Sequence, residues 1–435
     1  MVRWTRRLLY LLLGAGTLGA ALLLAAGLEE DPLPAQRPFE GQRLTVYLAE
    51  HPWTDIISGQ ADEFKRETGV ELQLVQVTEE QLQEKLAVQL ISRSDTPDVF
   101  MYRPYMDKQL YFKRGWLTPL NAYVSGSPDY DIADLTASAM ETNKVGDAIT
   151  SIPVFLDQFI LYYRKDILES HSEPVPRTLE ELSASAARLQ DPAQGLYGFI
   201  GRGQAVPLVT AVSSYVFSQG GDFITDGRAS LNTPQAVKGF RTYANLLASY
   251  APPEVLYLPW TQVMQEFAAG RAVYYTETSA IYKAILSENS FVRDKVGFAL
   301  FPAGDAGAKP YNVASWALAI NSGSQKKDAA WRFIQWATSK ENVLEAQRSG
   351  IIGVRASAWN DPRGVESYPP QLVEVVKKTI ESGSGHDVPQ MIRVGEGREV
   401  VGRIVVRAVL GEDIQAAADE ANQALQRLLD QEKPE

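Results

Sequence analysis

The sequence predicts an α/β protein built from two lobes, each an open mixed sheet flanked by helices. Three observations lead to this fold class. Short strands alternate with amphipathic helices between residues 44 and 101, and the same alternation returns between residues 296 and 337. The chain has 435 residues, of which 45% are hydrophobic, so it is long enough to fill more than one core.

The N-terminus carries an export or anchoring signal. Arg3, Arg6 and Arg7 precede an uncharged, mostly apolar run from Leu8 to Leu28. As a helix this run would be roughly 31 Å long, which is just enough to span a bilayer core. We therefore predict that residues 1–28 are either a signal peptide or a retained membrane anchor and that residues 29–42 are a tether. The rest of the chain would be extracytoplasmic, in the periplasm or at the outer face of the cytoplasmic membrane.

The first lobe is expected to begin with a βαβαβ unit. The pattern predicts a strand at 44–49, a helix at 56–64, a strand at 70–74, a helix at 82–90 and a strand at 98–101. Because the strands are joined through helices, they should lie parallel in an open, helix-flanked sheet.

Later segments complete both lobes. Strands are expected at 296–301 and 315–320, a helix at 330–337 and a closing helix at 414–429. Residues 156–300 hold helical segments separated by Gly-rich breaks, which is typical of a second lobe. The predicted lobes are residues 43–155 plus 310–351 and residues 156–305 plus 355–430.

Composition excludes several classes of function. The formal net charge of -11 repels phosphate backbones, so nucleic acid is not an expected partner. The chain has no cysteine, and its three histidines, His51, His171 and His386, are far apart in the sequence. We therefore expect no metal site, no cofactor and no Ser/His/Asp triad, and we expect the protein not to be an enzyme.

Aromatic residues follow two of the predicted strands. Trp53 lies just after the first strand and Tyr102 just after the third. In an open α/β sheet, ligands bind outside the carboxyl ends of the strands, so both residues are candidate ligand contacts. Alternatively, Trp53 packs on its own helix and Tyr102 belongs to a solvated loop.

An ordered set of short motifs resembles the family 1 extracellular solute-binding proteins of ABC importers. The likeness spans roughly residues 42–360. The motifs are Gly115–Leu120, Tyr162–Asp166, Leu179–Leu182, Phe267–Ala272 and Ala329–Ala337. Tyr197-Gly198 and Ser315–Ile320 are similar to the branch that binds sugars and sugar alcohols such as sorbitol and mannitol. The chain departs from that branch at Asp157, where a glutamate is usual, and at Gln204–Pro207, where an indole is missing.

The resemblance implies a type II periplasmic-binding-protein fold that closes around a hinge. Its implied partners are a carbohydrate or polyol ligand and the transmembrane permease subunits of an ABC transporter. The protein would be a monomer without a cofactor, and membrane-associated through its N-terminus if that segment is uncleaved.

The chemistry of a sugar ligand suggests which polar residues could bind it. A neutral sugar presents apolar faces, which flat aromatic rings cover, and hydroxyls, which charged planar groups bond. Asp157 can accept hydroxyl protons at the expected lobe crossing, and Arg202 can donate from a Gly-flanked loop. For both residues the alternative is a surface salt bridge.

The remaining candidates lie at strand ends or near the third crossing. Trp316 and Ser315 belong to the strand that returns to the first lobe, where Trp316 covers a sugar face or is buried core. Tyr275 and Glu277 end another strand. Two further candidates complete the set, Asn312 and Arg355, and Arg355 would either face the cleft or brace the hinge.

Two rival functions use the same residues. In a secreted glycoside-active enzyme, Asp157 and Glu277 would be the acid and base on either side of a scissile bond. In a membrane-anchored sensory receptor, residues 8–28 would be retained and the binding chemistry would be unchanged.

Overall fold

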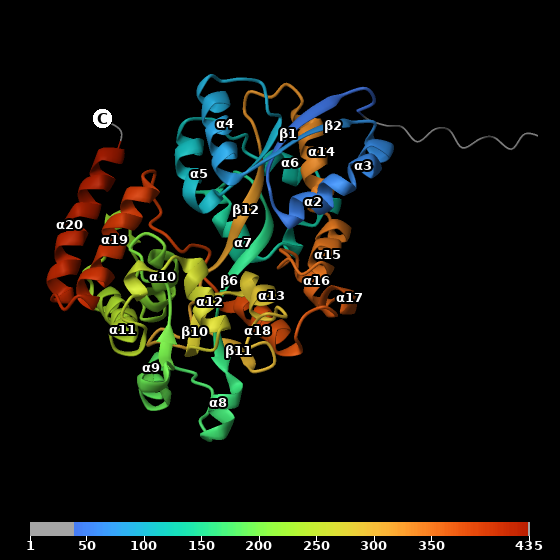
Figure 1. Ribbon diagram of the computed structural model, residues 1–435. Coiled ribbons are helices and arrows are strands. Elements are labelled where there is room, and N and C mark those ends of the chain that lie inside the picture. The colour runs from blue at the N-terminus through green and yellow to red at the C-terminus, as the bar shows by residue number, and fades with distance from the viewer. Residues whose placement is uncertain (1–38, 434–435) are drawn as a thin grey trace, which may run out of the picture.

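The computed structural model describes residues 39–433, and in it a single long strand connects two α/β bodies (Figure 1). The predicted signal peptide or anchor at 1–28 lies outside the described residues, as does most of the predicted tether at 29–42. We call the two bodies the first lobe and the second lobe, after the order in which the chain enters them.

The first lobe contains a five-stranded mixed sheet in the order β2-β1-β3-β12-β6. β1 (Arg43–Ala49) runs parallel to β2 (Glu71–Val77) and to β3 (Val99–Tyr102). β12 (Asn312–Ile320) returns from the second lobe and pairs antiparallel with β3. The expected parallel start is confirmed, and the returning strand makes the sheet mixed.

Helices cover both faces of this sheet. The single helix expected after β1 is divided at Gln60 into two. Thr78 begins the next helix by accepting a hydrogen bond from the backbone N–H of Gln81. The main helices of the first lobe are α2 (Pro52–Gly59), α3 (Ala61–Thr68), α4 (Glu79–Ile91), α5 (Pro104–Lys113), α6 (Asn121–Ser125), α7 (Ala137–Thr142), α14 (Lys327–Ala337) and α15 (Lys340–Arg348).

The second lobe is built on the far half of β6 (Ile152–Arg164). That half pairs antiparallel with β10 (Ala272–Thr278) and with β11 (Val296–Leu300), and β7 (Tyr197–Ile200) pairs parallel with β10. The helices of this lobe are α8 (Lys165–Ser170), α9 (Leu179–Leu189), α10 (Leu208–Ser218), α11 (Pro234–Tyr250), α12 (Trp260–Ala268), α13 (Tyr282–Ile285), α18 (Pro370–Ser382), α19 (Val394–Val409) and α20 (Ile414–Glu432).

β6 positions the site because it belongs to both sheets. Asp157 is paired with Val313 of β12 in the first sheet, whereas Ile160 is paired with Glu277 of β10 in the second. The pairing changes from one sheet to the other between Gln158, which is paired with Asn312, and Phe159, which is paired with Thr278. Any side chain near Asp157 lies at the junction between the two lobes.

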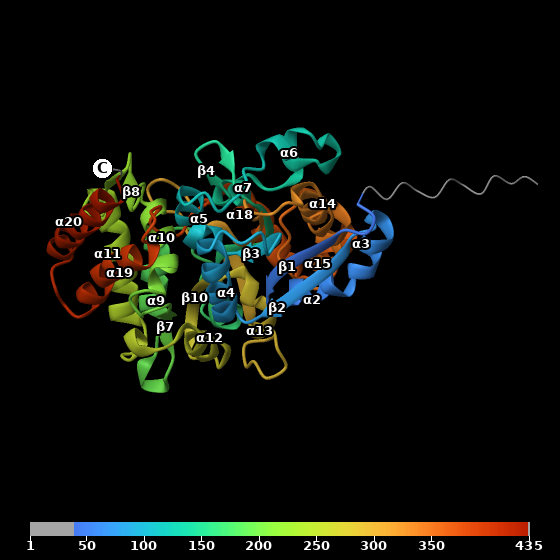
Figure 2. The same cartoon turned by 90° about the horizontal axis from the view of Figure 1, so that it is seen from above.

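The C-terminal helices form the outer layer of the second lobe. Figure 2 shows α19 and α20 beside α11, at the opposite end of the molecule from β1, β2 and α3. Ala417, Ala421 and Leu425 are buried in the core of this lobe, as the apolar stripe predicted for the closing helix.

Residues 355–368 lie in the first lobe, although the predicted boundary assigned them to the second. The short helices α16 (Ala356–Asn360) and α17 (Pro362–Val365) pack against α15, and Leu135 forms a β-bridge with Arg355. The chain then enters the second lobe at α18, which packs on β11 and β6. The third crossing thus follows α17.

Candidate functional site

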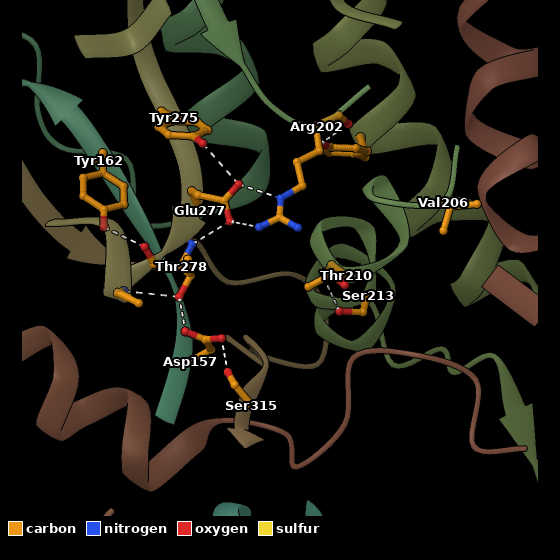
Figure 3. Close-up of polar contacts among 12 residues, drawn as sticks. Asp157, Tyr162, Arg202, Val206, Thr210, Ser213, Tyr275, Glu277, Thr278 and Ser315 are labelled. Atoms are coloured by element: carbon orange, nitrogen blue, oxygen red, sulfur yellow. Dashed lines mark hydrogen bonds and ion pairs between the residues drawn. The ribbon is translucent and has the colours of Figure 1, made fainter. Parts of the chain in front are cut away.

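A buried polar network lies at the junction between the lobes (Figure 3). Asp157 of β6 accepts a hydrogen bond from Thr278 Oγ1 at 3.0 Å and another from Ser315 Oγ of β12. Thr278 ends β10, so three strands from two sheets meet at one carboxylate. Because an ionised carboxylate offers about four acceptor sites, Asp157 keeps capacity for ligand hydroxyls.

Glu277 and Arg202 form a bidentate ion pair beside the carboxylate of Asp157. Arg202 donates from Nε to Glu277 Oε2 at 2.7 Å and from Nη2 to Oε1 at 2.6 Å. Tyr275 donates its hydroxyl to the same carboxylate at 3.1 Å, and the Thr278 backbone N–H donates at 2.9 Å. The Glu277 side chain is fully buried, so removing Arg202 would leave it without its ion-pair partner inside the protein.

Burial controls the electrostatics of the network. It raises the pKa of Asp157, and the hydrogen bonds from Ser315 and Thr278 act in the opposite direction. Burial alone would lower the pKa of Arg202, but the charge of Glu277 and their hydrogen bonds raise it. Arg202 therefore stays protonated and holds Glu277 in place, while Asp157 is the carboxylate of the network that is not part of an ion pair.

A pocket of about 330 Å³ adjoins Asp157 and has walls from both lobes. The first lobe contributes His51 and Trp316, and the second contributes Lys283 from α13. The His51 ring is stacked on Phe155, with centroids 4.2 Å apart and planes at 11°. The other lining residues are Pro52, Leu156, Asp157, Ala280, Ser315 and Ser349–Ile352. Flat rings and hydroxyl-bonding groups thus share one concave surface.

Six of the predicted site residues lie in this network or pocket. They are Asp157, Arg202, Tyr275, Glu277, Ser315 and Trp316. Their side chains come from residues far apart in the sequence and meet only at the junction of the lobes.

Trp53, Tyr102 and Asn312 are buried supports. The Trp53 side chain is completely buried in the core, which favours the packing alternative. The Tyr102 hydroxyl lies 3.0 Å from Ser151 Oγ, and the Tyr102 ring stacks on Tyr111. Asn312 donates from Nδ2 to Ser138 Oγ at 2.6 Å.

Arg355 braces the first lobe and does not reach the polar network. Its guanidinium donates to the backbone oxygens of Thr338, Asp131 and Tyr130 at 2.8, 3.0 and 3.2 Å, and to Asp134 at 3.3 Å. With all of these partners around it, the side chain is fully buried. Of the two roles expected for it, the structure supports the structural one.

Sequence reasoning missed several groups that surround the site. His51 and Lys283 line the pocket, and Thr278 links Asp157 to Glu277. The position of His51 next to Trp53, after the first strand, was the available signal for that residue. Lys283 lies in the one-turn helix α13, and no local pattern marks it.

Two absences apply to residues 39–433. Within this range no cluster of three or more His, Asp or Glu side chains could hold a metal ion. In the same range, no helix combines the length and the apolar character that crossing a membrane requires.

Comparison with known proteins agrees with this architecture. The family described as bacterial extracellular solute-binding protein matches residues 52–344. The mannitol-binding protein of Pseudomonas aeruginosa is 29% identical over 308 residues, covering 67% of this chain and 69% of the relative. The erythritol/L-threitol-binding protein of Mycolicibacterium smegmatis is 25% identical over 347 residues, covering 74% of this chain and 72% of the relative.

Solved structures share the fold over nearly the whole described chain. An ABC transporter solute-binding protein from Agrobacterium radiobacter K84, in complex with ribitol, superposes with a TM-score of 0.75 at 27% identity, covering 90% of this chain and 99% of that one. Maltose-bound T. maritima MalE3 has a TM-score of 0.72 at 23% identity, covering 89% and 99%, and supports the fold alone. The family match over residues 52–344 shows that the chain belongs to the family of bacterial extracellular solute-binding proteins.

Proposed function

We propose that this protein captures an uncharged sugar or sugar alcohol between its lobes and delivers it to the permease of an ABC transporter. The observation that carries this proposal is the combination of a pocket with walls from both lobes and the buried carboxylate of Asp157. The relatives named for mannitol and for erythritol and L-threitol, and the ribitol complex, support the same class of ligand.

The residues suit a hydroxyl-rich ligand. Asp157 can accept protons from ligand hydroxyls, and such charge-assisted bonds contribute about 1.5–3 kcal/mol each. Trp316 and the stacked pair of His51 and Phe155 supply flat rings for the apolar C–H faces. Lys283 brings a cation to the same pocket from the opposite lobe.

Binding would stabilise the closed arrangement of the lobes. A ligand that contacts Asp157, Trp316 and Lys283 touches both lobes at once, so it favours the form in which they are close together. The outer surface of that form differs from the open form, which lets a permease distinguish a loaded receptor from an empty one. On this proposal the protein works outside the cytoplasmic membrane as a monomer.

The ligand would leave chemically unchanged. A glycosidase acid must release a proton to the leaving group, but Glu277 is held in a buried bidentate ion pair with Arg202. Thr278 donates to both Asp157 and Glu277, so the two carboxylates are bound to the same residue. This arrangement supports a ligand-binding role for the two carboxylates.

Asp157→Asn tests the proposal directly. The substitution keeps the shape of the side chain but removes the charge, so we expect the affinity for ribitol or D-mannitol to fall at least tenfold, about 1.4 kcal/mol. Isothermal titration calorimetry of residues 39–435 measures the change, after a thermal-shift screen of polyols, monosaccharides and oligosaccharides has identified the best ligand.

The matched control is Asp430→Asn on the exposed surface of α20, which should leave the affinity unchanged. Equal affinity of the Asp157 variant and the wild type would remove this carboxylate from the site. Release of shortened sugars from an incubated oligosaccharide would contradict the binding function itself.

A further inference from the structure

A second carboxylate, Asp387, lies between the lobes with an unpartnered oxygen. Its side chain is 2% exposed, and its Oδ1 atom is buried without a hydrogen-bond partner among residues 39–433. A buried charge normally has full hydrogen bonding, because leaving it unpaired costs free energy. The position of Asp387 therefore calls for an explanation beyond packing.

The segment that carries Asp387 is fixed from three directions. Ser384 pairs with the start of β12, donating to Pro310 O and accepting from Asn312 N, both at 2.8 Å. Thr142 of the first lobe donates to Gly385 O at 2.9 Å. His386 contacts Asp222 of the second lobe at 3.1 Å. The backbone thus holds Asp387 at the boundary of the lobes.

Arg398 also has a buried polar atom without a hydrogen-bond partner, as Asp387 has. Its Nη2 donates to Val206 O of the second lobe at 3.0 Å, and its Nη1 lies 3.7 Å from Met106 Sδ of the first lobe. Its Nε is buried without a partner in the described part of the chain. Asp387 and Arg398 do not form an ion pair with each other. Burial raises the pKa of Asp387, and the positive charge of Arg398 acts in the opposite direction.

Asp387 and Asp157 act on the same tyrosines. Burial raises the pKa of Tyr105 to about 12, and both carboxylates add to this shift. Burial likewise raises the pKa of Tyr311, and again both carboxylates contribute to the shift. Hydrogen bonds of β12 also connect the two segments, because Asn312 donates to Ser384 O and Ser315 of the same strand donates to Asp157.

We infer that Asp387 and Arg398 form a second hydroxyl-binding group of the ligand site, opposite the Asp157 network. Asp387 Oδ1 accepts a ligand hydroxyl proton, and Arg398 Nε donates to a ligand oxygen. This inference rests on the proposed function and extends it, since a ligand with hydroxyls at both ends, such as a linear polyol, satisfies both groups at once.

The charges of the site define the class of ligand further. Arg202 is neutralised by Glu277, and Arg103 is neutralised by Glu79. The charged groups left to the ligand are the carboxyl groups of Asp157 and Asp387, the guanidinium of Arg398 and the ammonium of Lys283, so the charges balance when both carboxyl groups are ionised. An uncharged polyol fits this site, whereas a sugar acid would bring a further carboxylate next to two others.

Asp387→Asn provides the test, with ribitol, D-mannitol and D-gluconate as probes in calorimetry on residues 39–435. We expect the affinity for the polyols to fall at least tenfold. The ratio of the affinity for polyols to the affinity for gluconate should also decrease. The melting temperature of the ligand-free variant should be equal to or higher than that of the wild type, because a buried, incompletely paired charge is lost. A purely structural Asp387 would give the opposite stability result.

The control is Asp305→Asn, an exposed carboxylate of the second lobe that pairs with Lys238. It should alter neither the affinity for polyols nor the ratio of the affinities for polyols and gluconate. If Asp387→Asn does not fold, Arg398→Gln tests the same group and should also weaken polyol binding at least tenfold.

The outcomes distinguish a failure of the proposed function from a failure of the second hydroxyl-binding group. If wild-type protein binds none of the sugars and polyols in the thermal-shift screen, the proposed function fails. If the wild type binds ribitol or D-mannitol and a folded Asp387 variant binds it equally well, only the second hydroxyl-binding group is overturned.

Discussion

Individual residues of the site are held by neighbours that are distant in the sequence. Glu277 is fully buried, and Arg202, Tyr275 and the backbone of Thr278 all donate hydrogen bonds to its carboxylate. Removing one partner of such a pair usually costs more than the pair contributes, because a charge is then left buried and unpaired. Glu277 is therefore a support for Arg202 and Thr278 as well as a candidate ligand contact.

His51 gives a prediction at this scale. Burial lowers its pKa to about 4, from about 6.5 in an unfolded chain, and the charge of Asp55 opposes this shift. Between pH 6.5 and 4 the unfolded chain binds a proton that the folded protein does not. The free energy of unfolding should therefore fall as the pH falls through this window, by at most about 1.4 kcal/mol per pH unit from this group.

Urea denaturation between pH 4 and 7.5 checks this dependence. His51→Gln should flatten the pH profile in this window, since the titrating ring is gone. His171→Gln, on the exposed surface after α8, is the control for loss of an imidazole as such. An identical slope in the wild type and the His51 variant would contradict the assignment.

At the scale of elements, close backbone approach determines how α19 sits on the second lobe. A Cβ atom at Gly402 of α19 would lie 1.8 Å from the backbone oxygen of Ala205. The loop at Ala205 connects Arg202 with Val206, whose backbone oxygen accepts the hydrogen bond from Arg398. The glycine therefore lets α19 bring Arg398 close to the loop that carries Arg202.

Gly402→Ala should consequently destabilise the protein by about 1–3 kcal/mol, because a backbone contact cannot move aside as a side chain can. Gly395→Ala is a matched control in the same helix, since a Cβ there meets nothing within 4 Å. It should be neutral or stabilise by roughly 0.5 kcal/mol, because alanine has less freedom than glycine in the unfolded chain. Thermal unfolding followed by circular dichroism measures both, and equal melting temperatures would contradict the close approach.

At the scale of the whole molecule, contacts between the lobes lie on both sides of β6. Lys283 of the second lobe donates to Ser349 O of the first. On the other side, Lys113 of α5 donates to Glu432 O of α20 at 2.7 Å. A ligand that touches both lobes adds to these contacts and so favours the form in which the lobes are close together.

We expect ribitol or D-mannitol, whichever binds, to reduce the radius of gyration and raise the melting temperature. A ligand at 100 times its Kd stabilises the folded form by about 2.7 kcal/mol. Small-angle X-ray scattering with and without the polyol measures the compaction. Asp157→Asn at the same polyol concentration should show less of it, and unchanged scattering of a wild type that calorimetry proves to be loaded would rule out closure.

Local patterns in the sequence were sufficient for the strands of the βαβαβ start, for the closing helix and for the two-lobed class. They did not predict β6 or β7, because residues 156–300 were expected to hold helical segments and Gly-rich breaks. The alternation in residues 44–49 and the stripe in residues 414–429 depend on neighbours within a few positions, and both elements formed as expected. The motifs also led to the right family.

Which side chains face the ligand depended on packing between distant segments. Arg202 meets Glu277 across 75 positions, and Ser315 meets Asp157 across 158. Arg355 had the same kind of local signal as Arg202, yet the folded first lobe surrounds it with backbone oxygens. The physical reason is that strand and helix periods show which face of an element is apolar, whereas the partner of a polar side chain is set only when the lobes are assembled.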